Sequence, residues 1–239
     1  MQPEWLVLVV FLAAMIADHL VLWPSFQRRV SLDAARARRV LWSQWALVLW
    51  GCTTLVMGLW CVQGRPLSTL GLAVPAGWRL WGSLALTAAL VSAQGASAAR
   101  LARFAGDRSK LRRQLGNTGV VLPHAASELP GWIGMSVTAG FCEEVLFRGF
   151  VVWMLQPFAG WWGAAAASLA LFSLAHAYQG AEGLVRSAAL GAAITVLVFV
   201  TGSLWPAILL HAAIDFMGGW IGWLILRDIV RVSPATEGG

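Results

Sequence analysis

Three ionisable side chains interrupt one apolar stretch of the sequence: Glu143, Glu144 and Arg148. A charged group at the centre of a membrane helix costs about 2.5–3.5 kcal/mol, so such residues are functional by default. Glu144 and Arg148 are four residues apart and can form an ion pair on one helix face. Glu143 lies about 100° further around the helix, without a cation of its own. The spacing therefore predicts a structural pair and, in Glu143, a carboxylate that is free to act as a general base.

Two histidines follow in later apolar stretches, at His176 and His211. Asp215 is four residues after His211, so its carboxylate can hydrogen-bond the ring and fix its tautomer. Imidazole and carboxylate are ordinary zinc ligands, which makes Glu143, His176 and His211 a candidate zinc site with an open position for water. The same residues could run a metal-free mechanism with Glu143 as the base. Because the sequence has no His-Glu-x-x-His motif, the spacing leaves both alternatives open.

The order of these motifs resembles that of a known membrane-protein family. Glu-Glu-x-x-x-Arg, Phe-x-x-x-His and His-x-x-x-Asp occur on successive apolar segments. This pattern is similar to the CPBP family, which includes type II CAAX prenyl endopeptidases and bacteriocin-processing or Abi-like immunity proteins. The resemblance implies an intramembrane peptidase with six catalytic residues: Glu143, Glu144, Arg148, His176, His211 and Asp215.

The resemblance also implies a division of roles. Glu143 would activate water, and Glu144 with Arg148 would organise the site. The two histidines would position the water, a metal ion or the oxyanion. The family often has Asn where this sequence has Asp215, and an ionised Asp cannot donate a hydrogen bond to an oxyanion. We therefore expect Asp215 to orient the ring of His211.

The elements that must position these residues are membrane helices. Of the 239 residues, 59% are hydrophobic and 12% are charged, which is outside the balance of a soluble domain. Backbone groups in lipid must satisfy their hydrogen bonds internally, so the apolar stretches are predicted to be helices. The chain is predicted to be an all-α transmembrane bundle of about seven spans, within a range of six to eight. The stretches cover residues 5–23, 41–62, 78–99, 131–156, 160–177, 184–200 and 204–226.

The distribution of cations predicts the orientation of the chain. Fourteen of the 17 Lys and Arg residues fall on one side of these spans. By the positive-inside rule, the N-terminus is outside and the C-terminus is cytoplasmic. The net charge of +6 then reflects topology and predicts no nucleic-acid partner. We expect one transmembrane domain over residues 1–239, with the motif core at about 131–226, in a cell membrane such as a bacterial inner membrane.

Straight helices would separate the two histidines. His176 closes its predicted span near the cytoplasmic side, whereas His211 is about seven residues from the outer end of its own. Their heights would differ by roughly 10 Å, so tilted or broken helices must close the gap. Asp18 and His19 lie near the cytoplasmic end of the first predicted span, where we expect their side chains to reach the interface.

The leading hypothesis is a peptidase that cleaves a substrate tethered to the membrane by lipid or by its own helix. Prenyl-like tails, bacteriocin leaders and C-terminal sorting segments are candidate substrates, and membrane lipids are the expected surroundings. Two alternatives stay open: a transporter of protons or metal ions, and a non-catalytic membrane scaffold or immunity protein. A transporter is expected to have paired broken helices around a midplane site.

Overall fold

The structure is a computed structural model that describes residues 3–103, 112–113 and 115–227. Every regular element in the described residues is helical, as the composition predicts. The α-helices are α1 (Pro3–Ala17), α2 (Trp23–Val30), α3 (Ala34–Val62), α4 (Trp78–Arg103), α6 (Leu129–Glu143), α7 (Val152–Ala175), α8 (Gly180–Thr201) and α9 (Trp205–Leu226). Two π-helical segments, η1 (Asp18–Leu22) and η5 (Glu144–Val151), continue α1 and α6. Short 3-10 turns are η2 (Leu67–Leu70), η3 (Gly116–Val120), η4 (Ala126–Glu128) and η6 (Ala177–Gln179).

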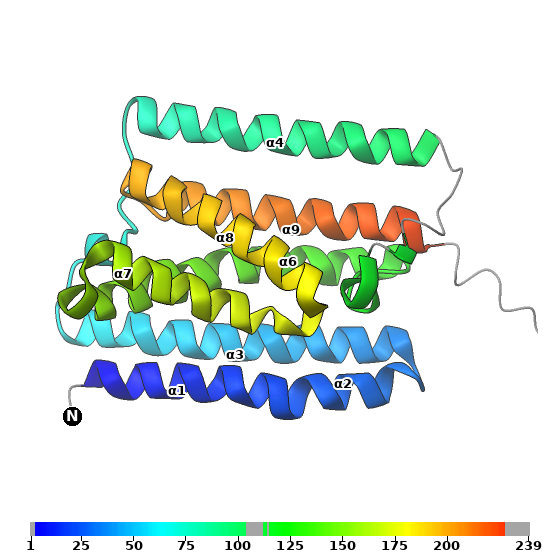
Figure 1. Ribbon diagram of the computed structural model, residues 1–239, viewed down its shortest axis with the longest axis horizontal. Coiled ribbons are helices and arrows are strands. Elements are labelled where there is room, and N and C mark those ends of the chain that lie inside the picture. Colours follow the sequence, from blue (N-terminus) through cyan, green and yellow to red (C-terminus); the bar gives the residue numbers. More distant parts are fainter. Residues whose placement is uncertain (1–2, 104–111, 114, 228–239) are drawn as a thin grey trace, which may run out of the picture.

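The long helices lie side by side in a bundle, with α1–α3 at one edge and α4 at the other (Figure 1). Five helical segments of the described residues are long and apolar enough to cross a membrane: Pro3–Val30, Ala34–Val62, Ala126–Ala175, Ala177–Thr201 and Trp205–Leu226. The longest of them, with 50 residues, changes direction at Gly160, where φ is 64° and ψ is 174°. It therefore contains the fourth and fifth predicted spans. The third predicted span lies in α4, a 26-residue helix that is not among the five.

The helix ends follow local sequence signals. Asp33 has extended backbone angles and accepts a hydrogen bond from the Arg36 backbone N–H at 2.9 Å, which starts α3. Pro130 and Pro206 stand in the first turns of α6 and α9, where a missing N–H costs no helical hydrogen bond. Gly202 ends α8 in the left-handed conformation that a residue without a Cβ adopts freely.

The hairpin of α7 and α8 resolves the expected difference in height between the histidines. After Gly160, α7 continues only to Ala175, about 22 Å at 1.5 Å per residue, whereas α3 has 29 residues. The turn between α7 and α8 consequently lies inside the bundle, short of the ends reached by α3 and α9 (Figure 1). His176 caps α7 at this turn and is therefore within the bundle rather than at its end.

A glycine sets how closely α6 approaches α9. A Cβ on Gly140 would lie 2.7 Å from the Ala212 Cβ, 2.8 Å from the Ala212 nitrogen and 2.9 Å from the Ile208 oxygen. Two of these atoms are backbone, so they cannot rotate away from an added methyl group. The contact is close to both Glu143 and His211 along their helices, which makes the helix separation at Gly140 a constraint on the site.

We predict that Gly140→Ala lowers the thermal stability and separates the residues of the site. Overpacking of this kind typically costs about 1–3 kcal/mol. Gly134→Ala is the matched control, because it lies on the same helix with no atom within 4 Å of the added Cβ. Thermal unfolding in detergent should show a lower midpoint for Gly140→Ala only. Equal midpoints for the two variants would contradict the close-approach argument.

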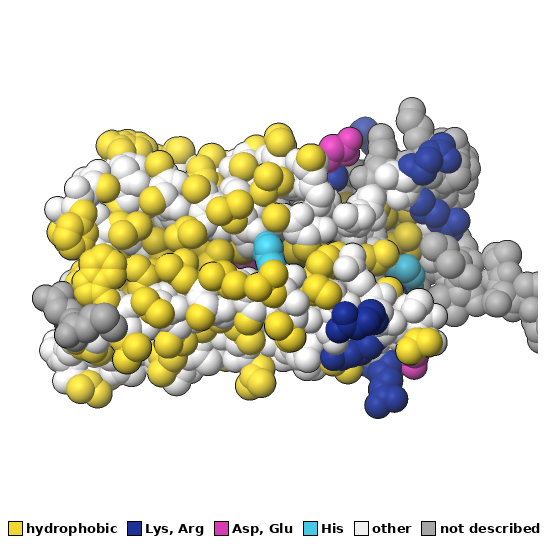
Figure 2. Space-filling view, turned by 60° about the horizontal axis from the view of Figure 1, so that its bottom comes forward, with side chains coloured by type: hydrophobic (Ala, Val, Ile, Leu, Met, Phe, Trp, Pro, Cys, Tyr) yellow, Lys and Arg dark blue, Asp and Glu magenta, His cyan; other side chains and the backbone are white. Residues whose placement is uncertain are grey.

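On the face that Figure 2 shows, cationic side chains gather at one end of the molecule, and most of the rest of this face is hydrophobic. Arg28, Arg29, Arg36 and Arg39 flank the turn between α2 and α3 in the sequence. This separation of charge along the bundle is what the positive-inside rule requires of a protein that crosses the membrane several times.

We predict that this basic end faces the cytoplasm. A reporter fused to the N-terminus should be accessible from outside, and reporters in the Arg28–Arg39 turn and at the C-terminus should be accessible only from the cytoplasm. Fusions assayed in intact cells and in inverted vesicles provide the measurement. A cytoplasmic N-terminal reporter would reverse the orientation.

Candidate active site

The ion pair predicted from the spacing of Glu144 and Arg148 is present. Arg148 Nη1 donates to Glu144 Oε1 at 3.0 Å, and both side chains are almost completely buried. Arg148 Nη2 also donates to the Gly191 carbonyl of α8 at 3.2 Å. The guanidinium lies 4.1 Å from the ring centroid of Phe172 on α7. The pair therefore connects η5 to two other helices. Because solvent does not reach these buried side chains, each neutralises the charge of the other.

His211 is held by Glu144 rather than by Asp215. The ring Nδ1 is 2.8 Å from Glu144 Oε1, and because a carboxylate only accepts, Nδ1 carries the hydrogen. Asp215 Oδ2 is 3.5 Å from the other nitrogen, Nε2, without a hydrogen bond. The expectation that Asp215 fixes the tautomer is therefore wrong in this geometry. The i,i+4 spacing brings Asp215 near the ring, but a carboxylate from another helix makes the shorter contact.

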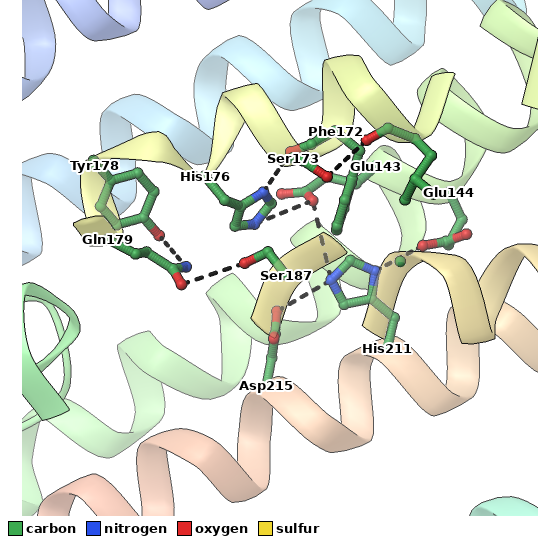
Figure 3. Close-up of polar contacts among 12 residues, drawn as sticks. Glu143, Glu144, Phe172, Ser173, His176, Tyr178, Gln179, Ser187, His211 and Asp215 are labelled. Carbon is green, nitrogen blue, oxygen red and sulfur yellow. Dashed lines mark hydrogen bonds and ion pairs between the residues drawn. The ribbon is translucent and has the colours of Figure 1, made fainter. Parts of the chain in front are cut away.

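His176 is held by its own helix. Its Nδ1 is 2.8 Å from the Phe172 carbonyl, an acceptor, so Nδ1 carries the hydrogen here as well. Both histidines thus direct Nε2 toward the same point, as the close-up shows (Figure 3).

Glu143 lies between the two rings. Its Oε2 is 4.0 Å from His176 Nε2 and 4.0 Å from His211 Nε2. The same oxygen is buried and has no hydrogen-bond partner. The fold thus brings together all six residues predicted for the site: Glu143, Glu144, Arg148, His176, His211 and Asp215 (Figure 3).

A cavity of about 350 Å³ adjoins Glu143 and extends among α1, α3, α6, α7, α8 and α9. Glu143, His176 and Asp215 lie on its wall, and most of the remaining lining is apolar. A concave, mainly apolar site with a few convergent polar groups is typical of a binding site for a small ligand or an extended segment.

Two polar residues on the cavity wall were expected elsewhere. Asp18 and His19 line the cavity, and they lie at the centre of the helical segment Pro3–Val30 rather than near its end. The predicted first span ends at Trp23, but the helix continues through Pro24, which is tolerated in the first turn of α2. The charged residues Arg28 and Arg29, rather than the tryptophan, mark the end of this segment.

The donor distances can be compared with those of a zinc site. At about 2.0–2.2 Å from each donor, zinc would subtend about 145° between atoms 4.0 Å apart, against about 109° in a tetrahedral site. Among the described residues, no three His, Cys, Asp or Glu side chains lie close enough together to hold a metal ion. These distances do not fit a tetrahedral zinc site formed by Glu143, His176 and His211. Zinc binding at these residues stays a prediction.

The family resemblance is confirmed for the part of the chain that carries the site. Residues 125–217 match the family model described as type II CAAX prenyl endopeptidase Rce1-like. This segment carries an Rce1-like domain, within the CPBP group that the motifs indicate, and it contains the six site residues. The family is one of proteases, and the apolar helices agree with a multi-pass membrane protein. Searches of curated proteins and of solved structures find no match.

We predict that substitution of Glu144 lowers the stability of the protein much more than substitution of Glu143. Glu144→Gln weakens a buried ion pair, and Arg148→Ala leaves Glu144 uncompensated, which typically costs about 3–5 kcal/mol. Glu143→Gln removes no hydrogen bond of Oε2, so its stability should stay within about 1 kcal/mol of wild type. Yield and thermal unfolding in detergent measure this difference. A Glu143→Gln protein as unstable as Arg148→Ala would show that the division of roles is wrong.

Proposed function

We propose that this protein is an intramembrane endopeptidase that hydrolyses a peptide bond in a membrane-tethered substrate, with Glu143 as the general base. One observation carries the proposal: the buried Glu143 Oε2 has no partner and faces two histidine nitrogens at the wall of a cavity. The match of residues 125–217 to a protease family supports the same reaction class.

The distances around Glu143 suit a water molecule. A water about 2.8 Å from two atoms that are 4.0 Å apart subtends about 90° between them, which hydrogen-bonding geometry accommodates. With its Nδ1 hydrogen committed to Phe172, a neutral His176 presents only its Nε2 lone pair. This lone pair and the Glu143 oxygen each accept a hydrogen, and water supplies two.

The reaction follows from this arrangement. Glu143 removes a proton from the water as the oxygen attacks the carbonyl carbon of the substrate, which gives a tetrahedral oxyanion and a protonated Glu143. The carbon–nitrogen bond then breaks as Glu143 delivers its proton to the leaving amine. One water is consumed, and one carboxyl and one amine are formed. Glu143 returns to its starting state.

His211 is placed to stabilise the oxyanion. Its ring lies between the carboxylates of Glu144 and Asp215, so it can carry a second hydrogen on Nε2, which stays on the ring and donates a hydrogen bond to the developing charge. In this mechanism Asp215 offsets the charge of the imidazolium. Asp215 thus acts through the ring rather than as a donor to the oxyanion.

The substrate class follows from the cavity and its surroundings. The apolar lining is suited to a lipid tail or apolar side chains next to the cleaved bond, and polar groups occur beside Glu143. Prenylated C-terminal segments fit this chemistry, and bacteriocin leaders and sorting segments are the other candidates. Because the residues of the site lie within the bundle, a substrate anchored in the membrane would reach them without leaving the membrane.

We predict that Glu143→Gln abolishes cleavage. The substrate is a farnesylated peptide with a fluorophore and a quencher on either side of the bond next to the prenylated cysteine, tested with protein purified in detergent. Loss of a general base typically lowers the rate about 10²–10⁴-fold. Glu182→Gln makes the same chemical change at an exposed position on α8 and should cleave as wild type does. Equal cleavage by Glu143→Gln and wild type would show that Glu143 is not the general base.

The same preparation tests zinc. Because the donor distances suit water better than a tetrahedral metal, we expect cleavage to survive treatment with a chelator. Elemental analysis should then give well under one zinc per active chain. Loss of cleavage on chelation, restored by adding zinc, would instead show that the reaction requires zinc.

A further inference from the structure

Asp18 and His19 form a second polar cluster in the middle of a membrane segment, outside the residues matched by the family model. They open η1, and Glu144 opens η5; these are the two π-helical segments of the described residues. Such segments cost hydrogen-bond geometry and occur frequently at functional sites. Intramembrane ionisable residues are themselves functional by default. Two separate features of Asp18 and His19 thus require an explanation.

The cluster joins three helical segments through hydrogen bonds. Trp45 Nε1 on α3 donates to Asp18 Oδ1 at 2.7 Å. Asp18 Oδ2 is 3.6 Å from His19 Nδ1. His19 Nε2 is 2.9 Å from the Leu174 carbonyl in the last turn of α7. Because a carbonyl only accepts, His19 Nε2 carries a hydrogen, and the line of contacts ends two residues before His176.

The two histidines of the site differ in what holds them. His211 is fixed by Glu144, which is itself fixed by Arg148. Among the residues that the structure describes, the one hydrogen-bond partner of the His176 ring is the Phe172 carbonyl of its own helix, which ends at His176. A helix end is less constrained than its middle, because its last carbonyls lack intrahelical partners. The bond from His19 to Leu174 supplies a constraint from another helix at this point.

A second contact supports the same side. Trp45, which donates to Asp18, lies 5.3 Å from the ring centroid of Tyr178, and Tyr178 lies 6.2 Å from that of His176 at an interplanar angle of 29°. Two sets of contacts thus lead to His176. One runs from His19 through Leu174, and the other runs from Trp45 through Tyr178.

Asp18 also faces the second ring nitrogen of His19. The Nδ1 of His19 is buried and has no hydrogen-bond partner, and it faces a carboxylate oxygen. Nε2 of the ring is directed to the Leu174 carbonyl and Nδ1 to the Asp18 carboxylate, so Asp18 contributes to the orientation of His19.

We propose that Asp18 and His19 are positioning residues that hold the last turn of α7 and thereby fix His176 next to Glu143. The proposal rests on the proposed function only for its effect on cleavage. The constraint on His176 is a property of the structure and can be measured without a substrate. The His19 side chain is itself 37% exposed.

The experiment measures the rate at which diethyl pyrocarbonate modifies each histidine of the full chain in detergent, by mass spectrometry. For His19→Ala we expect modification of His176 to rise about twofold to tenfold, the factor that corresponds to one hydrogen bond, with His211 unchanged. His19→Gln should restore most of the protection, because its amide can donate to Leu174. Leu20→Ala, an exposed position in the same π-helical segment, should behave as wild type.

Asp18→Asn distinguishes a weaker hydrogen bond from His19 to Leu174 from the loss of the His19 side chain itself. This variant leaves the His19 side chain in place but removes the carboxylate that helps to orient it. The rate at which His176 is modified should therefore rise again. An unchanged rate at His176 in both Asp18→Asn and His19→Ala, or an equal rise at His211 and His124, would overturn the proposal. In the cleavage assay, His19→Ala should lower kcat with little change in KM. The wild-type protein could cleave no substrate while the variants still change the rate at which His176 is modified. That result would support the positioning role and refute the proposed function.

Discussion

The site depends on one buried charged interaction, the contact of Arg148 with Glu144. Each group alone would be costly in a low-dielectric interior, so the two must stay together, and the pair can be satisfied only by acceptors and donors from neighbouring helices. Gly191 on α8 accepts from Arg148, and His211 on α9 donates to Glu144. The requirement to satisfy these groups therefore fixes the positions of α8 and α9 relative to η5.

This interaction also explains why two adjacent glutamates differ. Glu144 Oε1 accepts from both Arg148 and His211, which leaves no cation of the same strength for Glu143. The oxygen Oε2 of Glu143 instead faces the cavity and the Nε2 atoms of His176 and His211. The pair that stabilises the bundle thus creates the unpaired carboxylate that the proposed reaction uses, and the close approach at Gly140 keeps the two helices near enough for both.

The second histidine is supported in a different way. His176 stands at the end of a helix that stops inside the bundle. Its constraints come from Trp45, Asp18 and His19, which precede the segment that matches the family. The N-terminal helices therefore have a part in the geometry of the site, beyond anchoring the chain in the membrane.

The sequence by itself determined the properties that depend on local periodicity. Composition predicts an all-helical membrane protein, and the i,i+4 spacing predicts the pair of Glu144 with Arg148, because both follow from residues close together in the chain. The motifs also identify the six residues that converge. The choice of Glu144 over Asp215 as the partner of His211 and the depth of His176 were decided by tertiary structure alone. So was the placement of Asp18 on the cavity wall. Spacing along one helix cannot reveal these contacts, because they depend on where other helices cross, bend and end.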